Sequence, residues 1–286
     1  MNHSWRNLVL VAVFCCAACD DGSEKVPAFE VPDLTCAPDD WPTAATVGLP
    51  DDAPALMPIE EDLHTDRDGE IFDGVLLRGR LYVDHPNVVI RNSLLVGDIY
   101  YAIYSTAGGT GLTIEDCDIT GGVLIADGFT GRRNHLYAAE GGTRNDGWIL
   151  SASHVLLEDN LIDGLVGSEG AHLDGIQVMG GDDVVIRHNW IEAVSPPIDG
   201  GGVNAAVFFK PDFGRISNVV VDCNMLIEEE GYYPLRIQAH GQVVVRANRW
   251  RTGHLGGAYH LEDTVPTVWE DNAYEDGTPV TWEGEN

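Results

Sequence analysis

The chain has 286 residues and a formal net charge of −30, from 46 acidic and 16 basic residues. This balance argues against a nucleic-acid partner, which requires a basic face, and against loose attraction of polyanions. A polyanionic ligand would need a local cationic patch or a bridging divalent cation. The sequence contains no zinc-ligand spacing, phosphate-binding loop, dinucleotide fingerprint or nucleophile elbow.

Residues 1–18 have the features of an export signal. An apolar run from Leu8 to Ala18 follows one arginine and is too short to span a membrane. Small residues before Cys19 resemble a bacterial lipoprotein signal. The resemblance implies cleavage before Cys19, lipidation of Cys19, and a chain that is exported and lipid-anchored to a bacterial membrane or cell surface. Cys16 stands where a leucine is usual, so an ordinary secretory signal is the alternative.

Residues 19–43 predict a flexible tether between this signal and a folded domain. Acidic residues and prolines are frequent in this segment, and they favour an extended, solvated chain. We therefore expect one domain, residues 44–286, after the tether.

From about residue 70 onward, one template recurs seven times: an apolar triplet, then a polar residue three positions after its last member. The third apolar positions are Ile90, Ile114, Leu157, Ile186, Val221, Val245 and Trp269. The residues three positions on are Ser93, Cys117, Asn160, Asn189, Asn224, Asn248 and Asn272. The base unit is about 24 residues long, and longer gaps hold loops or, in one case, a whole extra coil.

This repeat predicts an all-β fold, a single-stranded parallel β-helix of about eight or nine coils over residues 44–286. A second β-rich run lies about nine residues upstream of each third apolar position, and helical periodicity is almost absent. Equivalent turn positions then stack roughly 4.8 Å apart, so the asparagines form a hydrogen-bonded ladder.

The same geometry separates the cysteines. Cys117 and Cys223 lie in turn columns at least three coils apart, roughly 14 Å, which is beyond the reach of a disulfide bond. Cys36 has no obvious partner, so we expect no disulfide framework despite the predicted export to an oxidising compartment.

Three further segments are VGLPDDAPAL (47–56), DGVLLRGRLYV (73–83) and HLDGIQV (172–178). Together with the repeat, they resemble right-handed parallel β-helix proteins of the pectate-lyase-like superfamily, over residues 44–286. The resemblance implies a polysaccharide lyase-like enzyme. We expect its partner to be an acidic polysaccharide, and we expect the chain to be a monomer.

Alternation along the upstream runs predicts an outward column. Leu235 and Ile237 must point inward, so Arg236 and Gln238 point out. Gln177 and His260 point out at positions equivalent to Arg236. Lys210 joins this column if the turn after it absorbs a two-residue insertion, and Asp212 occupies the slot otherwise. The candidate substrate-binding residues of the neighbouring coils are His172, Asp174, Gln177, Gln238 and His260.

A lysine and an arginine on neighbouring coils suit β-elimination of a uronic-acid glycan. A cation must stabilise the enolate-like transition state, and a base must take the C5 proton. The resemblance implies Lys210 as the base and Arg236 as the group that binds the carboxylate or assists departure, beside a calcium ion. The family's acidic ligands are missing before Lys210, so Asp174, Asp199 and Asp212 are the candidate calcium ligands.

Two other functions fit the same residues. Paired carboxylates among Asp174, Asp199 and Asp212 would suit glycoside hydrolysis. A non-catalytic carbohydrate-binding solenoid would use exposed aromatic rings. The insertion 123–147 would supply the substrate-binding residues Arg132 and Arg133 if it folds over the strand face, and it is a solvated loop otherwise.

Overall fold

The computed structural model of this chain describes residues 40–138, 146–165, 172–193, 202–228, 233–251 and 256–284. These residues belong to one compact unit, Val31–Asn286. They form twenty-five β-strands joined by turns. The described part contains no helix that could cross a membrane. The predicted all-β parallel solenoid is confirmed.

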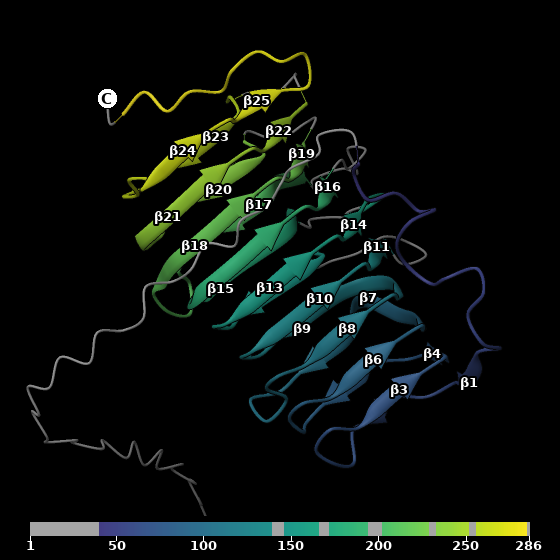
Figure 1. Cartoon of the computed structure of the whole chain (residues 1–286). Helices are drawn as coiled ribbons and strands as arrows, with labels where there is room; N and C mark the ends of the chain where they lie inside the picture. The colour runs from purple at the N-terminus through teal and green to yellow at the C-terminus, as the bar shows by residue number, and fades with distance from the viewer. Residues whose placement is uncertain are drawn as a thin grey trace, which may run out of the picture. The chain divides into compact units, whose positions relative to one another are not determined.

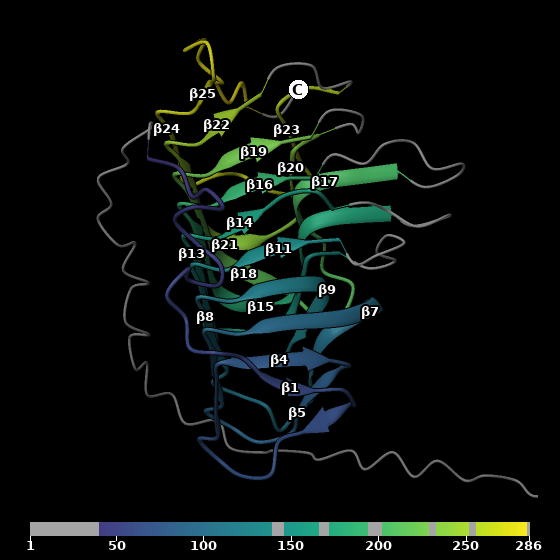
Figure 2. The ribbon, with the colours of Figure 1, turned by 90° about the vertical axis from the view of Figure 1, so that its right-hand side faces the viewer.

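The strands form three parallel walls, and the chain visits the walls in turn, so that each coil adds one strand to each wall (Figure 1). Wall 1 contains β1 (Met57–Ile59), β4 (Val75–Arg78), the first parts of β7 (Leu94–Ser105) and β9 (Asp118–Ile125), β11 (His135–Tyr137), β14 (Leu161–Ile162), β16 (Trp190–Glu192), β19 (Met225–Ile227), β22 (Arg249–Trp250) and β25 (Ala273–Tyr274). Figure 2 shows these strands one above another.

The other two walls follow wall 1 along each coil. Wall 2 contains β2 (Leu63–His64), β5 (Leu81–Val83), the last parts of β7 and β9, β12 (Trp148–Ser151), the first part of β15 (His172–Arg187), β17 (Gly202–Phe209), β20 (Leu235–Ile237) and β23 (Tyr259–Leu261). Wall 3 contains β3 (Ile71–Asp73), β6 (Val89–Arg91), β8 (Thr113–Glu115), β10 (Phe129–Arg132), β13 (Val155–Glu158), the last part of β15, β18 (Ile216–Asp222), β21 (His240–Arg246) and β24 (Val268–Glu270). Wall 3 thus has nine strands, which agrees with the predicted number of coils.

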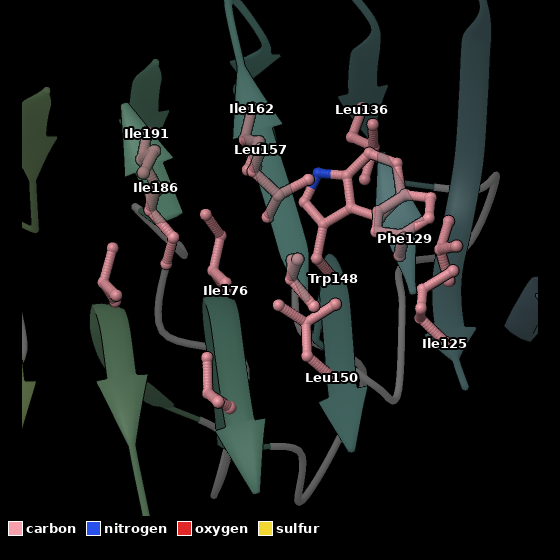
Figure 3. Packing of buried hydrophobic residues seen from close by; sticks show 14 of the residues in the cluster. Ile125, Phe129, Leu136, Trp148, Leu150, Leu157, Ile162, Ile176, Ile186 and Ile191 are labelled. Carbon is pink, nitrogen blue, oxygen red and sulfur yellow. The ribbon is translucent and has the colours of Figure 1, made fainter. Parts of the chain in front are cut away.

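The extra coil lies in the longest gap of the repeat. In wall 3, Gly131 pairs with both Ile114 and Leu157, in the column of third apolar residues. A Cβ atom on Gly131 would lie 2.8 Å from Leu157 Cδ2. The space is filled by Phe129, whose ring centroid lies 5.2 Å from that of Trp148 (Figure 3). The apolar template misses this coil because its volume comes from neighbouring rings.

The asparagine ladder connects wall 3 to wall 1, and Asn134 of the extra coil belongs to it. Each side-chain amide donates to the carbonyl oxygen of the next ladder asparagine, from Asn134 to Asn160 at 3.0 Å through to Asn248 and Asn272 at 3.1 Å. The amides also donate to backbone carbonyls of the preceding coil. These buried polar groups are therefore satisfied, as burial requires.

The residue before each ladder position has a left-handed backbone. Arg133, Asp159, His188 and Cys223 have φ angles of 51, 57, 52 and 55°. This conformation turns the chain sharply between the two walls, and asparagine, aspartate and histidine adopt it more readily than most residues.

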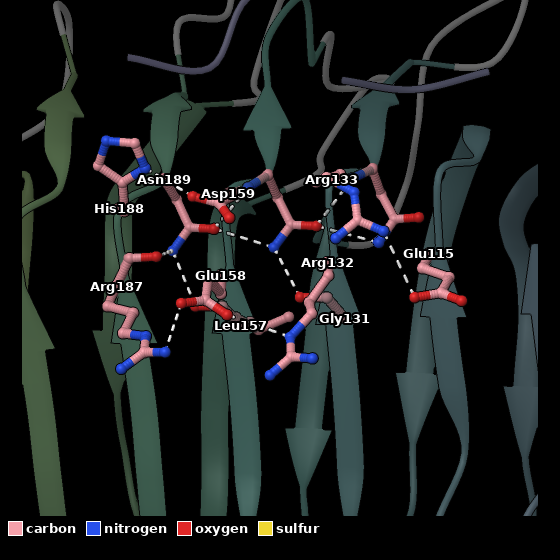
Figure 4. A network of polar contacts seen from close by, with 12 residues as sticks. Glu115, Gly131, Arg132, Arg133, Leu157, Glu158, Asp159, Arg187, His188 and Asn189 are labelled. Atoms are coloured by element: carbon pink, nitrogen blue, oxygen red, sulfur yellow. Dashed lines mark hydrogen bonds and ion pairs between the residues drawn. The ribbon is translucent and has the colours of Figure 1, made fainter. Parts of the chain in front are cut away.

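A charge ladder runs along the outer face of wall 3, one residue after the apolar column. Its members, from β3 to β24, are Asp73, Arg91, Glu115, Arg132, Glu158, Arg187, Asp222, Arg246 and Glu270. The sign of the charge alternates at every step. Ion pairs join Arg91 to Asp73 at 2.8 Å and Arg246 to Asp222 at 2.9 Å, and Glu158 forms ion pairs with both of its neighbours, Arg132 and Arg187 (Figure 4).

The cysteines differ from one another. Cys117 is buried and free, as we expect for a turn filler. Cys223 is disulfide-bonded, which corrects the prediction that no disulfide forms. The chain has no described cysteine besides these two, so the partner lies outside the described residues. Sequence spacing excluded only a bond between Cys117 and Cys223.

Candidate functional site

The outer face of wall 2 carries one register-aligned row, which we call the outer column. It consists of His64, Tyr82, Tyr104, Leu124, Ile149, Gln177, Phe208, Arg236 and His260. The predicted neighbourhood of Arg236 and His260 is confirmed, since the two residues pair directly. The inward neighbours Leu235 and Ile237 are buried, as alternation requires.

Lys210 does not belong to this column, which corrects its predicted register. Phe208 pairs with both Gln177 and Arg236, so Lys210 lies two residues further along the wall. The connection from the column residue Phe208 to the next strand of wall 3 therefore contains an insertion longer than the two residues that the prediction allowed for. The ammonium of Lys210 is half exposed and lies 3.4 Å from Asp212 Oδ1.

Arg236 is the centre of the site because contacts on two sides fix its guanidinium. The guanidinium carbon lies 4.2 Å from the centroid of the Phe208 ring, within the range of a cation–π contact. Nη1 donates to Asn204 Oδ1 at 2.7 Å. Nε is buried and has no hydrogen-bond partner. Within the described residues, Arg236 has no ion pair, so its charge stays available to an anionic ligand.

Two buried carboxyl groups lie behind Arg236. The backbone N–H of Asp174 donates to Asp146 Oδ1 at 2.7 Å, and Asn204 Nδ2 lies 3.4 Å from Asp174 Oδ2. Asp174 is 1% exposed, and its Oδ1 has no hydrogen-bond partner. Asp174 therefore points inward, away from the solvent face on which a substrate-binding residue would have to lie.

Burial decides the charge of this pair. Desolvation raises the pKa of Asp146 to about 7. Desolvation, and then the nearby Asp146, hold the pKa of Asp174 well above its usual value, although Asn204 and Arg236 act in the opposite direction. The raised pKa of Asp174 weakens the electrostatic pairing of this acid with Arg236. Sequence analysis missed Asp146, although its position two residues before the inward Trp148 matches that of Asp174 before Ile176.

The predicted calcium ligands do not converge in the described residues. Asp174 pairs with Ala205 in β17, whereas Asp212 lies in the turn after that strand. Asp199 lies outside the described residues. No group of three or more potential ligands (His, Cys, Asp or Glu) occurs in the described part of the chain. A buried carboxyl with a raised pKa is also a poor calcium ligand, because calcium binds the ionised form. These residues do not fit the calcium site that the resemblance implies.

The remaining predicted residues have different positions. Gln177 lies in the outer column, and the N–H of Gln238 donates to Phe209, beside Lys210. Arg132 belongs to the charge ladder of wall 3. Arg133 lies at the turn before the ladder residue Asn134 and donates to Asp116 at 2.7 Å, so residues 123–138 of the insertion belong to a coil. The side chain of His172 and all of Cys19 lie outside the described residues.

The outer column also contains rings at both of its ends, and several of them pack on other rings. The His64 and Tyr82 rings are nearly parallel at 4.4 Å, and Tyr82 lies 5.9 Å from Tyr104. His260 stacks on Tyr233 at 5.2 Å. Rings stacked along the solenoid axis present edges to solvent, so their faces are occupied.

Comparisons with known proteins give no relative for this chain: no family model matches it, and neither a curated protein nor a solved structure is similar to it. The function must therefore be argued from the chemistry of wall 2.

Proposed function

We propose that the outer face of wall 2 binds an acidic polysaccharide and cleaves it by β-elimination, in the manner of pectate-lyase-like enzymes. The observation that carries this proposal is the fixed, unpaired guanidinium of Arg236 in a chain of net charge −30. A planar guanidinium binds a carboxylate through two parallel hydrogen bonds. A uronic acid is the sugar class that carries such a carboxylate.

In the proposed reaction, Arg236 binds the uronate carboxylate and stabilises the negative charge that develops when a base takes the C5 proton. The electron pair left at C5 forms the C4=C5 double bond, the C4–O4 bond breaks, and the leaving O4 takes a proton from solvent. His260 is the base that the geometry favours, because it pairs with Arg236 on the next coil. Imidazole is the commonest side-chain base near neutral pH. Lys210 is the second candidate, and it lies two residues further along the wall than the outer column, with its ammonium 3.4 Å from Asp212 Oδ1.

The test is incubation with a panel of uronic-acid polysaccharides while the absorbance of the unsaturated product is recorded. We expect Arg236→Ala to lower the rate about a hundredfold or more. His260→Ala should abolish the reaction, whereas Lys210→Ala should retain it if His260 is the base. New reducing ends without unsaturation would contradict β-elimination and indicate hydrolysis.

A non-catalytic binding module is the second candidate. It is favoured by the pairing of Lys210 with Asp212 and by the burial of Asp174, which leave the outer face with few groups poised for proton transfer. Glycan binding that depends on Arg236 but produces no turnover would support it.

We further propose that the protein is exported and lipid-anchored through Cys19. The disulfide bond of Cys223 supports export, because such bonds persist mainly in oxidising compartments.

A further inference from the structure

The C-terminal tail, residues 275–284, folds back over the last coil. The Val280 N–H donates to Asn272 at 2.8 Å, and Trp269 Nε1 donates to the Val280 carbonyl at 2.8 Å. The Tyr259 hydroxyl donates to the Thr281 carbonyl at 3.0 Å. The bond to Tyr259 fixes the tail beside β23 in wall 2.

A cleft of about 460 Å³ lies between the tail and β23. It is lined by His260, Asp263 and Trp282, among others. His260 thus belongs both to this cleft and to the outer column, directly beside Arg236. The cleft therefore continues the row that we propose to bind the glycan.

Trp282 differs from the other rings near wall 2. Several rings of the outer column pack on other rings, whereas Trp282, which is partly exposed, has no ring contact within the described residues. An indole face can stack on the apolar face of a sugar ring. Asp263 supplies carboxylate oxygens that accept hydrogen bonds from hydroxyl groups.

We propose that this cleft holds the terminal sugar unit of the glycan, stacked on Trp282, while Arg236 binds the carboxylate of a unit further along the chain. This inference rests on the function proposed above. Within the described residues β23 is the last strand of wall 2, and the tail is hydrogen-bonded to Tyr259 there, so the tail lies across the path of a glycan along the wall. Asp263 makes the cleft acidic, so the bound unit is recognised through its hydroxyl groups.

The experiment measures the binding of uronic-acid oligosaccharides to the full chain by calorimetry. We expect Trp282→Ala to weaken binding by about tenfold, as the loss of an aromatic stacking contact does. Trp282→Phe should restore part of the affinity, and Asp263→Asn should keep the turn while weakening binding. Trp190→Ala is the matched control on wall 1, and it should leave binding unchanged.

Oligosaccharides with a bulky label at one end or the other test whether the bound unit is terminal. We expect one of the two labels to abolish binding. Binding that tolerates both labels, or Trp282→Ala binding as tightly as the unchanged protein while Arg236→Ala binds weakly, would overturn the cleft and leave the proposed function standing. Failure of the unchanged protein to bind any uronic-acid glycan would overturn both.

Discussion

Burial of Asp174 behind Arg236 raises the pKa of this acid, and this weakens its pairing with the guanidinium. Contacts with Phe208 and Asn204 hold the guanidinium in place. Within the described residues the guanidinium forms no ion pair. Burial of the two acids is what makes this possible, since desolvation disfavours a charged carboxylate far more than a neutral carboxyl.

The pH dependence of stability tests this buried pair. The pKa of Asp146 is raised to about 7, above the value near 4 of an unfolded chain. The folded state therefore holds a proton that the unfolded state releases, so the contribution of Asp146 is fully present below about pH 4 and is lost as the pH rises through 7. We expect Asp146→Asn, which keeps an oxygen for the Asp174 N–H, to be more stable than the unchanged protein at pH 8, by roughly 2–4 kcal/mol.

The measurement is urea unfolding at pH 4.5 and at pH 8. The two proteins should be similar in stability at the lower pH, where Asp146 carries its proton. An equal pH slope in both proteins would show that Asp146 is ionised in the folded state.

At the scale of the elements, the charge ladder of wall 3 specifies the register. Opposite charges directly across neighbouring strands stabilise a sheet, and like charges destabilise it. A strand that paired with its second neighbour in place of its first would set like charges opposite each other at that junction. Arg132, from the cationic segment 123–147, forms an ion pair with Glu158 in this ladder. This arginine therefore lies on wall 3 and does not contribute to the site on wall 2.

Substitutions at Arg187 test this ladder, because this residue lies between Glu158 and Asp222 and is mostly buried. We expect Arg187→Gln to destabilise the protein by about 1–3 kcal/mol, since the ion pair with Glu158 is lost and Asp222 loses a neighbouring positive charge. Arg187→Glu should cost more, because three acids then stand in a row. High salt should narrow the difference between the two variants, since salt screens the repulsion. An equal loss in both variants would assign the effect to packing and not to charge.

At the scale of the whole molecule, the three walls have different tasks. On wall 3, the charged residues form ion pairs with one another. The asparagine ladder connects wall 3 to wall 1. Wall 2 presents the guanidinium of Arg236, which has no ion pair within the described residues. The disulfide bond of Cys223 adds a covalent link to this stack, at a turn residue directly before the ladder residue Asn224.

Reduction tests that link. We expect a reducing agent to lower the melting temperature of the full chain, since removing a native disulfide typically costs 2–5 kcal/mol. Cys223→Ser should match the reduced protein and stop responding to the reductant. Cys117→Ser is the control and should still respond, because Cys117 is free. A chain with Cys223 intact whose melting is unchanged by the reductant would contradict a structural role for the bond.

The amino-acid sequence by itself determined the solenoid, the inward and outward alternation, and five of the ladder asparagines, because stacking repeats these features at a fixed period. It missed Gly131 and Asn134, since the apolar volume of that coil comes from Phe129 and Trp148. Only the tertiary structure decided the register of Lys210, because a turn can absorb residues without a local signal. Only the structure showed that Asp146 and Asp174 are buried together and that the tail forms a cleft with β23, because such contacts join residues far apart in the chain.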